Sequence, residues 1–300
     1  MSILVSGLLN IETNLKIDDF PYDYTPINFS FFGVKSSVSG VGYNIAKALN
    51  TLGQEVKLIS IIGKDILGKT IEAEIQAQGI STEYLSKSIE ENPQTVILYD
   101  KTGRRSLNTD LKDIQESQVH EEIFLPALEA CSTAVLCNIN FSRKYLKKAK
   151  ALGKLIATDV HVISDLKDEY NKDFMSNADI LFMSDERLPC EPEEWAKKVM
   201  DTYGNEIVVI GMGSKGSLMA VKKDNFIERI PAYYTRPVIN TVGAGDSFFS
   251  SFIYEYNKYK NPYDAIKKAS VFASYKIGEK TASEGFLKEG ELEAWCKEVL

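Results

Sequence analysis

The 300-residue sequence predicts an α/β fold with a mostly parallel central sheet, and three observations support this prediction. Short β-rich apolar runs alternate with segments of helical periodicity along most of the chain, which is typical of parallel strands joined by crossover helices. Several helical segments stop at a glycine, as at Gly53, Gly79 and Gly153. No internal repeat or low-complexity linker divides the chain, so we expect one main domain over residues 1–300.

In the first part of the chain, an apolar opening strand is followed by residues 10–35, which mix Asp, Pro, Tyr and Phe without a helical period. A second β-like segment lies at residues 94–109. A βα section of the main sheet separates the two, so we expect them to converge outside that sheet as a small β lid. The other elements predicted here are helices over residues 41–52 and 69–78 and strands over residues 55–62 and 95–99.

The second half of the chain alternates more regularly between the two periods. It predicts a parallel βα succession, then a short β section, then two long helices. The predicted strands are residues 134–138, 155–159, 180–183, 207–210, 217–221 and 226–230. The predicted helices are residues 143–152, 192–203, 244–259 and 262–277.

Composition mainly excludes classes of function. The net charge is −7, which argues against a general nucleic-acid or anionic-membrane binder. No apolar run approaches the roughly 20 residues of a membrane-spanning helix, and the N-terminus lacks the basic region of a signal peptide. The four cysteines form no CxxC pair and there are two histidines, which disfavours a zinc site or a Ser-His-Asp triad. We therefore expect a cytoplasmic protein with reduced thiols.

Residues 240–246 (NTVGAGD) carry the clearest sign of chemistry. Glycines flank Ala244, so the turn has little side-chain bulk, and its backbone N–H groups stand at a predicted helix start where they attract an anion. Asp246 then lies beside that anion, where a carboxylate can take a proton from a hydroxyl that attacks a phosphoryl group. The alternative interpretation is structural, since Asp in a first turn also favours the helix dipole.

Residues 39–44 (SGVGYN) also enter a predicted helix through glycines. They are not a dinucleotide fingerprint, because its third glycine would fall at Ile45. Gly40 and Gly42 still permit close approach of a ligand, and Asn44 offers a donor and an acceptor, which suits a polyhydroxylated molecule. The alternative is that Asn44 only caps the helix.

Together these segments resemble the PfkB (ribokinase-like) family of carbohydrate and nucleoside kinases, and the family's motifs occur in order along nearly the whole chain. The most specific is the match of residues 240–246 to D-T-x-G-A-G-D. The other matching segments are residues 7–12 (GLLNIE), 39–46 (SGVGYNIA), 62–68 (IGKDILG), 79–80 (GI) and 211–216 (GMGSKG).

The resemblance implies a ribokinase-like three-layer αβα fold whose lid is formed by about residues 10–35 and 94–109. It implies ATP-dependent transfer of the γ-phosphoryl group to a primary hydroxyl of a sugar, with Asp246 as general base and the amides of Gly243, Ala244 and Gly245 as anion hole. Mg²⁺ would bridge the phosphates and be held by water rather than by named protein ligands. The residues expected at the acceptor are Glu12, Gly40, Gly42, Asn44, Tyr99 and Arg105. Those expected at the nucleotide are Ser184, Gly211, Gly213, Ser214, Gly216, Thr241 and Gly243.

Several positions depart from the family pattern. Ser39 replaces the first glycine of the sugar signature, and its Cβ narrows the approach of a substrate. Asn240 and Val242 replace residues that help ribokinases bind a monovalent cation, so we expect weak or absent activation by K⁺. The family's N-x-x-E, which organises Mg²⁺-bound water, corresponds to residues 184–187 (SDER), where both named positions are lost. His161, two residues after Asp159, is interpreted as a loop histidine.

Two classes of function compete. The first is a kinase, of a sugar or of a nucleoside; the GVGYNIA string at residues 40–46 is similar to that of pseudouridine kinase-like members. Lid aromatics such as Tyr24 and Tyr99 could stack on a base, pack the lid or pair two copies of the chain, and Arg105 could reach substrate or stay solvated. The second class is a catalytically weak sugar or nucleotide sensor, suggested by the altered motif positions. Asp246 beside its glycine turn favours the enzyme, and the missing fingerprint argues against a dehydrogenase.

Overall fold

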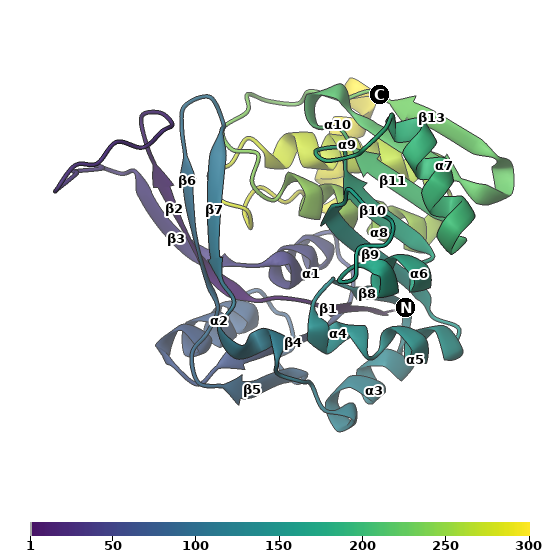
Figure 1. Cartoon of the computed structure of the whole chain (residues 1–300), viewed down its shortest axis with the longest axis horizontal. Coiled ribbons are helices and arrows are strands. Elements are labelled where there is room, and N and C mark those ends of the chain that lie inside the picture. The colour runs from purple at the N-terminus through teal and green to yellow at the C-terminus, as the bar shows by residue number, and fades with distance from the viewer. Residues whose placement is uncertain (1) are drawn as a thin grey trace.

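The computed structural model describes residues 2–300 and has three layers, with a nine-stranded sheet in the middle (Figure 1). The interior strand β1 is buried along its whole length, as parallel strands covered on both faces are. The strand order is β13-β12-β11-β10-β9-β8-β1-β4-β5, and pairing is parallel except at β12 and β13. The strands are β1 (Ser2–Ser6), β4 (Val56–Gly63), β5 (Leu85–Ile89), β8 (Cys131–Leu136), β9 (Leu155–Val162), β10 (Ile180–Ser184), β11 (Ile207–Gly211), β12 (Ser217–Val221) and β13 (Phe226–Ile230).

Helices cover both faces of this sheet, and each face has its own apolar core. Their ends carry the expected signals: α7 has Pro192 in its first turn and stops at left-handed Gly204, and the Asn261 side chain caps α9. One face is covered by α1 (Val41–Thr51), α2 (Ile66–Ala77), α8 (Ala244–Tyr259), α9 (Pro262–Lys276) and α10 (Glu289–Val299). The other is covered by α3 (Glu121–Glu129), α4 (Asn140–Arg143), α5 (Leu146–Ala151), α6 (Lys172–Asn177) and α7 (Pro192–Tyr203).

A separate four-stranded sheet, which we call the lid, stands away from the body of the molecule (Figure 1). It consists of β3 (Val34–Ser39), β2 (Asn10–Lys16), β6 (Gln94–Tyr99) and β7 (Arg105–Asp110), in that order. The Ser283 hydroxyl donates to the Val38 carbonyl at 2.9 Å, and the Lys35 ammonium lies 2.7 Å from the Glu284 carboxylate. These contacts join one edge of the lid to the loop before α10.

The predicted α/β fold with a mostly parallel sheet and a small second sheet is confirmed, and the errors in single elements have local causes. The helix predicted over residues 143–152 is two helices, α4 and α5, because Tyr145 between them is held in the core. Its ring stacks on Phe124 and its hydroxyl donates to the Val119 carbonyl at 2.6 Å. The strand β5 and the helices α3, α6 and α10 were not predicted.

In the described residues 2–300, no helix combines the length and apolar character needed to cross a membrane. All four cysteines are free thiols, and three of them are buried.

Gly42 provides a test of the packing that brings β1 and α1 together. A Cβ at Gly42 would lie 2.6 Å from the Gly7 carbonyl carbon, so Gly42→Ala should destabilise the fold by about 1–3 kcal/mol in urea unfolding. Gly290→Ala is the matched control, because it too lies in a helix and its Cβ would meet nothing within 4 Å. That variant should gain about 0.5–1 kcal/mol. Equal stability of the two variants would refute this account.

Candidate active site

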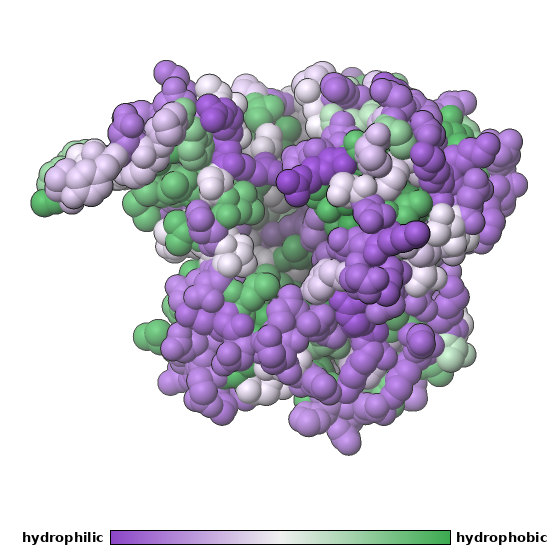
Figure 2. Space-filling view, viewed as in Figure 1, coloured by the Kyte–Doolittle hydropathy of each residue, from purple (hydrophilic) through white to green (hydrophobic). Residues whose placement is uncertain are grey.

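The candidate site lies between the lid and the body, at the carboxyl ends of the central parallel strands, where open α/β sheets place their ligands. Asp246 enters it from the first turn of α8, Asn44 from the first turn of α1, and Glu12 from β2 of the lid. Figure 2 shows the surface hollowed between these two parts of the molecule. Residues far apart in the sequence therefore meet at one edge of the sheet.

The turn before α8 is shaped by Gly243, whose φ of 76° lies in the left-handed region. A Cβ at residue 243 would also lie 2.7 Å from the Ala282 carbonyl oxygen. Glycine is therefore required here both by the backbone conformation and by the close packing. The Ala244 amide already donates to the Thr241 carbonyl at 3.2 Å. The amides of Gly243 and Gly245 have no protein partner within residues 2–300 and are free for an anion.

Asp246 accepts a hydrogen bond of 2.7 Å from the Asn44 side-chain amide. Burial raises the pKa of the Asp246 carboxyl, and nearby Asp159 raises it further, while the Asn44 hydrogen bond, His161 and Lys276 act in the opposite direction. A carboxylate with a raised pKa is a stronger base, and Asn44 fixes its orientation. The site thus holds one oriented, basic carboxylate beside free backbone amides.

A cavity of about 220 Å³ opens in front of Asp246 and is lined mainly by polar side chains. Glu12 is its organising group: it accepts from the Asn14 amide at 2.8 Å and from the Ser39 hydroxyl at 3.1 Å. The Ser39 hydroxyl also lies 3.3 Å from the side-chain amide oxygen (Oδ1) of Asn44. Ser39 therefore does more than narrow the approach, because its hydroxyl joins two of the predicted acceptor residues. We call this cavity the acceptor pocket.

A second cavity of about 380 Å³ lies on the other side of the same turn. Thr241, Ala244 and Gly245 line this cavity, whereas Val242, Gly243 and Asp246 line the acceptor pocket. The other residues that line this cavity form an apolar surface that suits a planar ring. A polar, glycine-rich rim lies next to this surface. We call it the nucleotide pocket, and its other predicted residues are Gly211, Gly213, Ser214 and Gly216.

The lid reaches the turn through Arg105, whose guanidinium donates to the Thr241 hydroxyl at 2.5 Å. Arg105 lies on β7 and lines the acceptor pocket, so one side chain touches the lid, the acceptor pocket and the turn. Arg105 is exposed as well as bonded to the turn, so its expected role at the acceptor stays a prediction.

Three predicted site residues do not line either pocket. Gly42 is buried against Gly7, so its lack of a side chain serves the packing of the chain on itself and not the approach of a ligand. Tyr99 ends β6 opposite Lys16, away from the acceptor pocket. Ser184 ends β10 beside Gly211, and its hydroxyl accepts from the Glu186 amide.

One acidic and one basic residue near Asp246 were not predicted as site residues. Asp159, within β9, has a carboxylate oxygen near Gly245, 3.9 Å from where a Cβ at Gly245 would lie. Lys276, at the end of α9, is fully buried and donates to the Val242 carbonyl. In the sequence, the Asp-Val-His string pointed to Asp159, whereas no motif pointed to Lys276.

The fit of a magnesium ion can be judged from the acidic residues. No group of three His, Cys, Asp or Glu side chains within residues 2–300 forms a metal cluster. Asp159 stands beside the turn, and Mg²⁺ commonly uses one carboxylate together with phosphate oxygens and water. The arrangement therefore fits an ion that arrives with a phosphate ligand, for which Asp159 is an available carboxylate.

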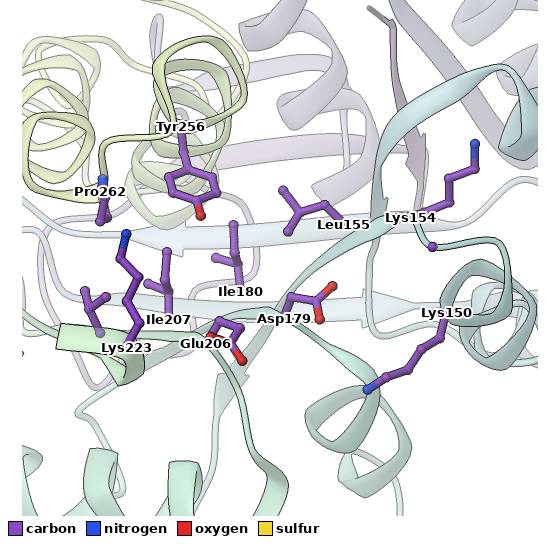
Figure 3. Close-up of a pocket in the computed structure, with 12 residues that line it drawn as sticks. Lys150, Lys154, Leu155, Asp179, Ile180, Glu206, Ile207, Lys223, Tyr256 and Pro262 are labelled. Atoms are coloured by element: carbon purple, nitrogen blue, oxygen red, sulfur yellow. The ribbon is translucent and has the colours of Figure 1, made fainter. Parts of the chain in front are cut away.

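A third cavity, of about 420 Å³, lies elsewhere (Figure 3). It opens at the amino ends of three parallel strands, at Leu155, Ile180 and Ile207, and charged side chains such as Asp179 and Lys150 line it. This is the opposite end of the strands from Asp246. It shares no residue with the acceptor pocket or the nucleotide pocket.

Comparison with known proteins identifies the family and the fold. Residues 2–289 match the model of the pfkB family carbohydrate kinases. The chain is similar to the 5-dehydro-2-deoxygluconokinase of Clostridium perfringens, with 26% identity covering 92% of this chain and 91% of that protein. Among solved structures, a microbiome-derived acarbose kinase has a TM-score of 0.89 at 23% identity, covering 99% of this chain and 98% of that one. A nucleoside kinase from Burkholderia thailandensis in complex with inosine has a TM-score of 0.78 at 18% identity, covering 100% of this chain and 99% of that one.

The Asn44 hydrogen bond makes a testable contribution to the ionisation of Asp246. Because this bond favours the charged carboxylate, Asn44→Ala should move the Asp246 titration to higher pH. Carbon-13 NMR of the carboxyl group measures this midpoint. Asn50→Ala is the control: Asn50 lies on the same helix but donates to the Gln78 carbonyl. An unchanged midpoint in Asn44→Ala would contradict the assigned role.

Proposed function

Because this chain belongs to the pfkB family of carbohydrate kinases, we propose that it transfers the γ-phosphoryl group of ATP to a primary hydroxyl of a sugar. The observation that carries the proposal is the position of the turn at residues 243–246. The turn separates the acceptor pocket from the nucleotide pocket and contributes residues to both. A phosphoryl group passing between two ligands would have to cross at this turn.

In the proposed mechanism, Asp246 takes the proton of the attacking hydroxyl as its oxygen bonds to the γ-phosphorus and the bond to ADP breaks. The free amides of Gly243 and Gly245 would hold the oxygens on which negative charge accumulates. Mg²⁺, bound with the phosphates near Asp159, would supply charge neutralisation. Ala244 contributes its small side chain, while its own amide is already engaged in the turn.

The lining of the acceptor pocket supports a sugar over a nucleoside. Among the described residues, no aromatic side chain lines it, so nothing in the pocket offers a ring on which a base would stack. Glu12, Asn44 and Thr95 instead present oxygen and nitrogen atoms to hydroxyl groups. Tyr24, in the segment between β2 and β3, is 90% exposed and does not line the pocket.

Arg105 bears on which sugars the acceptor pocket would take. It adds a guanidinium to a pocket that otherwise holds carboxylates and neutral polar groups, so a sugar acid is as good a candidate as a neutral sugar. The 5-dehydro-2-deoxygluconokinase among the relatives is named for such an acid. Nucleoside kinase activity is the second candidate, since an inosine-bound nucleoside kinase shares the fold.

We predict that the purified protein consumes ATP with at least one acceptor from a panel of pentoses, hexoses, 5-dehydro-2-deoxygluconate, acarbose and nucleosides. Asp246→Asn should lower the turnover of that acceptor by about 10²–10⁴-fold, because the general base is lost. Its nucleotide affinity should be largely kept. A coupled assay of ADP release with each acceptor measures the rate.

Asp264→Asn is the matched control for this substitution. Asp264 also lies in the first turn of a helix, but it is exposed and remote from both pockets. If Asp246→Asn keeps the wild-type rate, the base assignment is wrong. If the wild type and Asp246→Asn are equally inert with every acceptor while ligands still bind, the chain is a sensor.

We also propose that two copies of the chain pair through the lid and that the enzyme works in the cytoplasm. The segment between β2 and β3 carries several exposed apolar side chains, and it projects from the body in Figure 2. A cluster of this kind on a surface is typical of an interaction site. The exposed residues of this segment are Tyr22, Tyr24, Ile27, Phe29, Phe31 and Phe32. The four free thiols suit a reducing compartment.

Analytical ultracentrifugation tests the pairing. The wild type should sediment at twice the chain mass of 33.6 kDa, and the double variant Phe29→Ser, Phe31→Ser should sediment as a monomer. Ile66→Ser is a control, since Ile66 is exposed to a similar degree but lies on α2. A wild type that stays monomeric at all concentrations would exclude the dimer.

A further inference from the structure

Lys276 is a buried cation that the mechanism above does not use. It is the last residue of α9, its side chain has no exposed surface, and its ammonium donates to the main-chain carbonyl of Val242. Val242 directly precedes Gly243, so the ammonium contacts the turn from the side opposite the solvent. It lines neither the acceptor pocket nor the nucleotide pocket.

Burying a lysine is costly, because the ammonium loses its hydration. Burial lowers the pKa of Lys276 to about 8, which works against its positive charge. The charges around it explain why it is retained: Asp246, Glu12 and Glu279 favour the cation, and Arg105 opposes it. The charged lysine is thus paired electrostatically with the carboxylates of the acceptor pocket and bonded to the backbone of the turn.

We infer that Lys276 is a positioning residue for phosphoryl transfer, a tethered cation that fixes the Val242 carbonyl and so aims the amides of Gly243 and Gly245 at the transferred group. The inference rests on the proposed function. The Val242 carbonyl and the Gly243 N–H belong to one trans peptide group and point in opposite directions, so a cation that fixes the carbonyl also fixes the direction of that N–H. The same positive charge favours the ionised form of Asp246.

The rest of the turn shows why such a cation is needed. Asn240 accepts from the Val242 amide at 3.0 Å and donates to the Lys280 carbonyl at 2.8 Å, so the start of the turn is held by neutral groups. The Val242 carbonyl is buried, and Lys276 is its one recorded side-chain partner within residues 2–300. Without the ammonium, that carbonyl would be left unpaired in the interior.

The experiment compares the binding of two magnesium-nucleotide probes, AMP-PNP and ADP, by titration calorimetry in a buffer free of K⁺ and ammonium. AMP-PNP carries the terminal phosphoryl group that the turn would hold, and ADP lacks it. Lys276→Ala should bind AMP-PNP about tenfold or more weakly, with a smaller loss for ADP, because a charged hydrogen bond to the turn is removed. Methylammonium, ammonium or K⁺ should restore AMP-PNP binding in this variant and have little effect on the wild type.

Two further variants separate positioning from a general loss of structure. Lys276→Met should show the same selective loss without rescue, because its side chain fills the space that a small cation would enter. Lys267→Met, an exposed lysine on the same helix, should bind both probes as the wild type does. Thermal unfolding shows whether each variant is folded. If Lys276→Ala does not fold, the test of the inference rests on whether Lys276→Met selectively loses AMP-PNP binding.

Each outcome bears on a different claim. A wild type that binds neither probe overturns the proposed function and this inference with it. If the wild type binds AMP-PNP and a folded Lys276→Ala binds it equally well, the inference alone is wrong. A loss in Lys276→Ala that is equal for both probes and is restored by none of the cations would make Lys276 a structural residue only.

Discussion

The geometry of one short turn determines how the rest of this site works. Gly243 adopts a left-handed conformation against the Ala282 carbonyl, and this places the next residues at the start of α8. From there, unpaired amides face one way and the Asp246 carboxylate enters the acceptor pocket. A side chain at Gly243 would strain the backbone and collide with the loop behind it, so the two pockets depend on a single residue without a side chain.

Charged side chains of both signs surround this turn. Carboxylates from α8 and the lid line the acceptor pocket, Asp159 on β9 lies near Gly245, and buried Lys276 bonds to the Val242 carbonyl of the turn. The raised pKa of Asp246 follows from burial, with Asn44 and Lys276 limiting the shift. A base that is desolvated and yet held in its charged form by neighbours is suited to accepting a proton near neutral pH. The electrostatics and the shape of the site therefore support the same chemistry.

The lid contributes residues to the site and also covers it. Glu12 and Arg105 lie on its strands, and each is bonded to a residue outside its own strand: Glu12 to Ser39 at the end of β3, and Arg105 to Thr241 in the turn. Movement of the lid would therefore alter the acceptor pocket and the turn together. Under the proposed function, such coupling would let substrate binding and the exclusion of water occur in one step.

Local sequence determined the class of the fold and the chemistry of the turn, because both depend on short-range patterns. Alternating periods specify strands and helices, and the order G-A-G-D places amides and a carboxylate on one helix start whatever surrounds them. Tertiary structure alone decided which other residues join them. It buried Gly42 against Gly7, left Tyr99 outside the acceptor pocket, and brought Asp159 and Lys276 to the turn from strands and helices distant in sequence. Those contacts arise from the packing of α9, β9 and the lid, which no local pattern encodes.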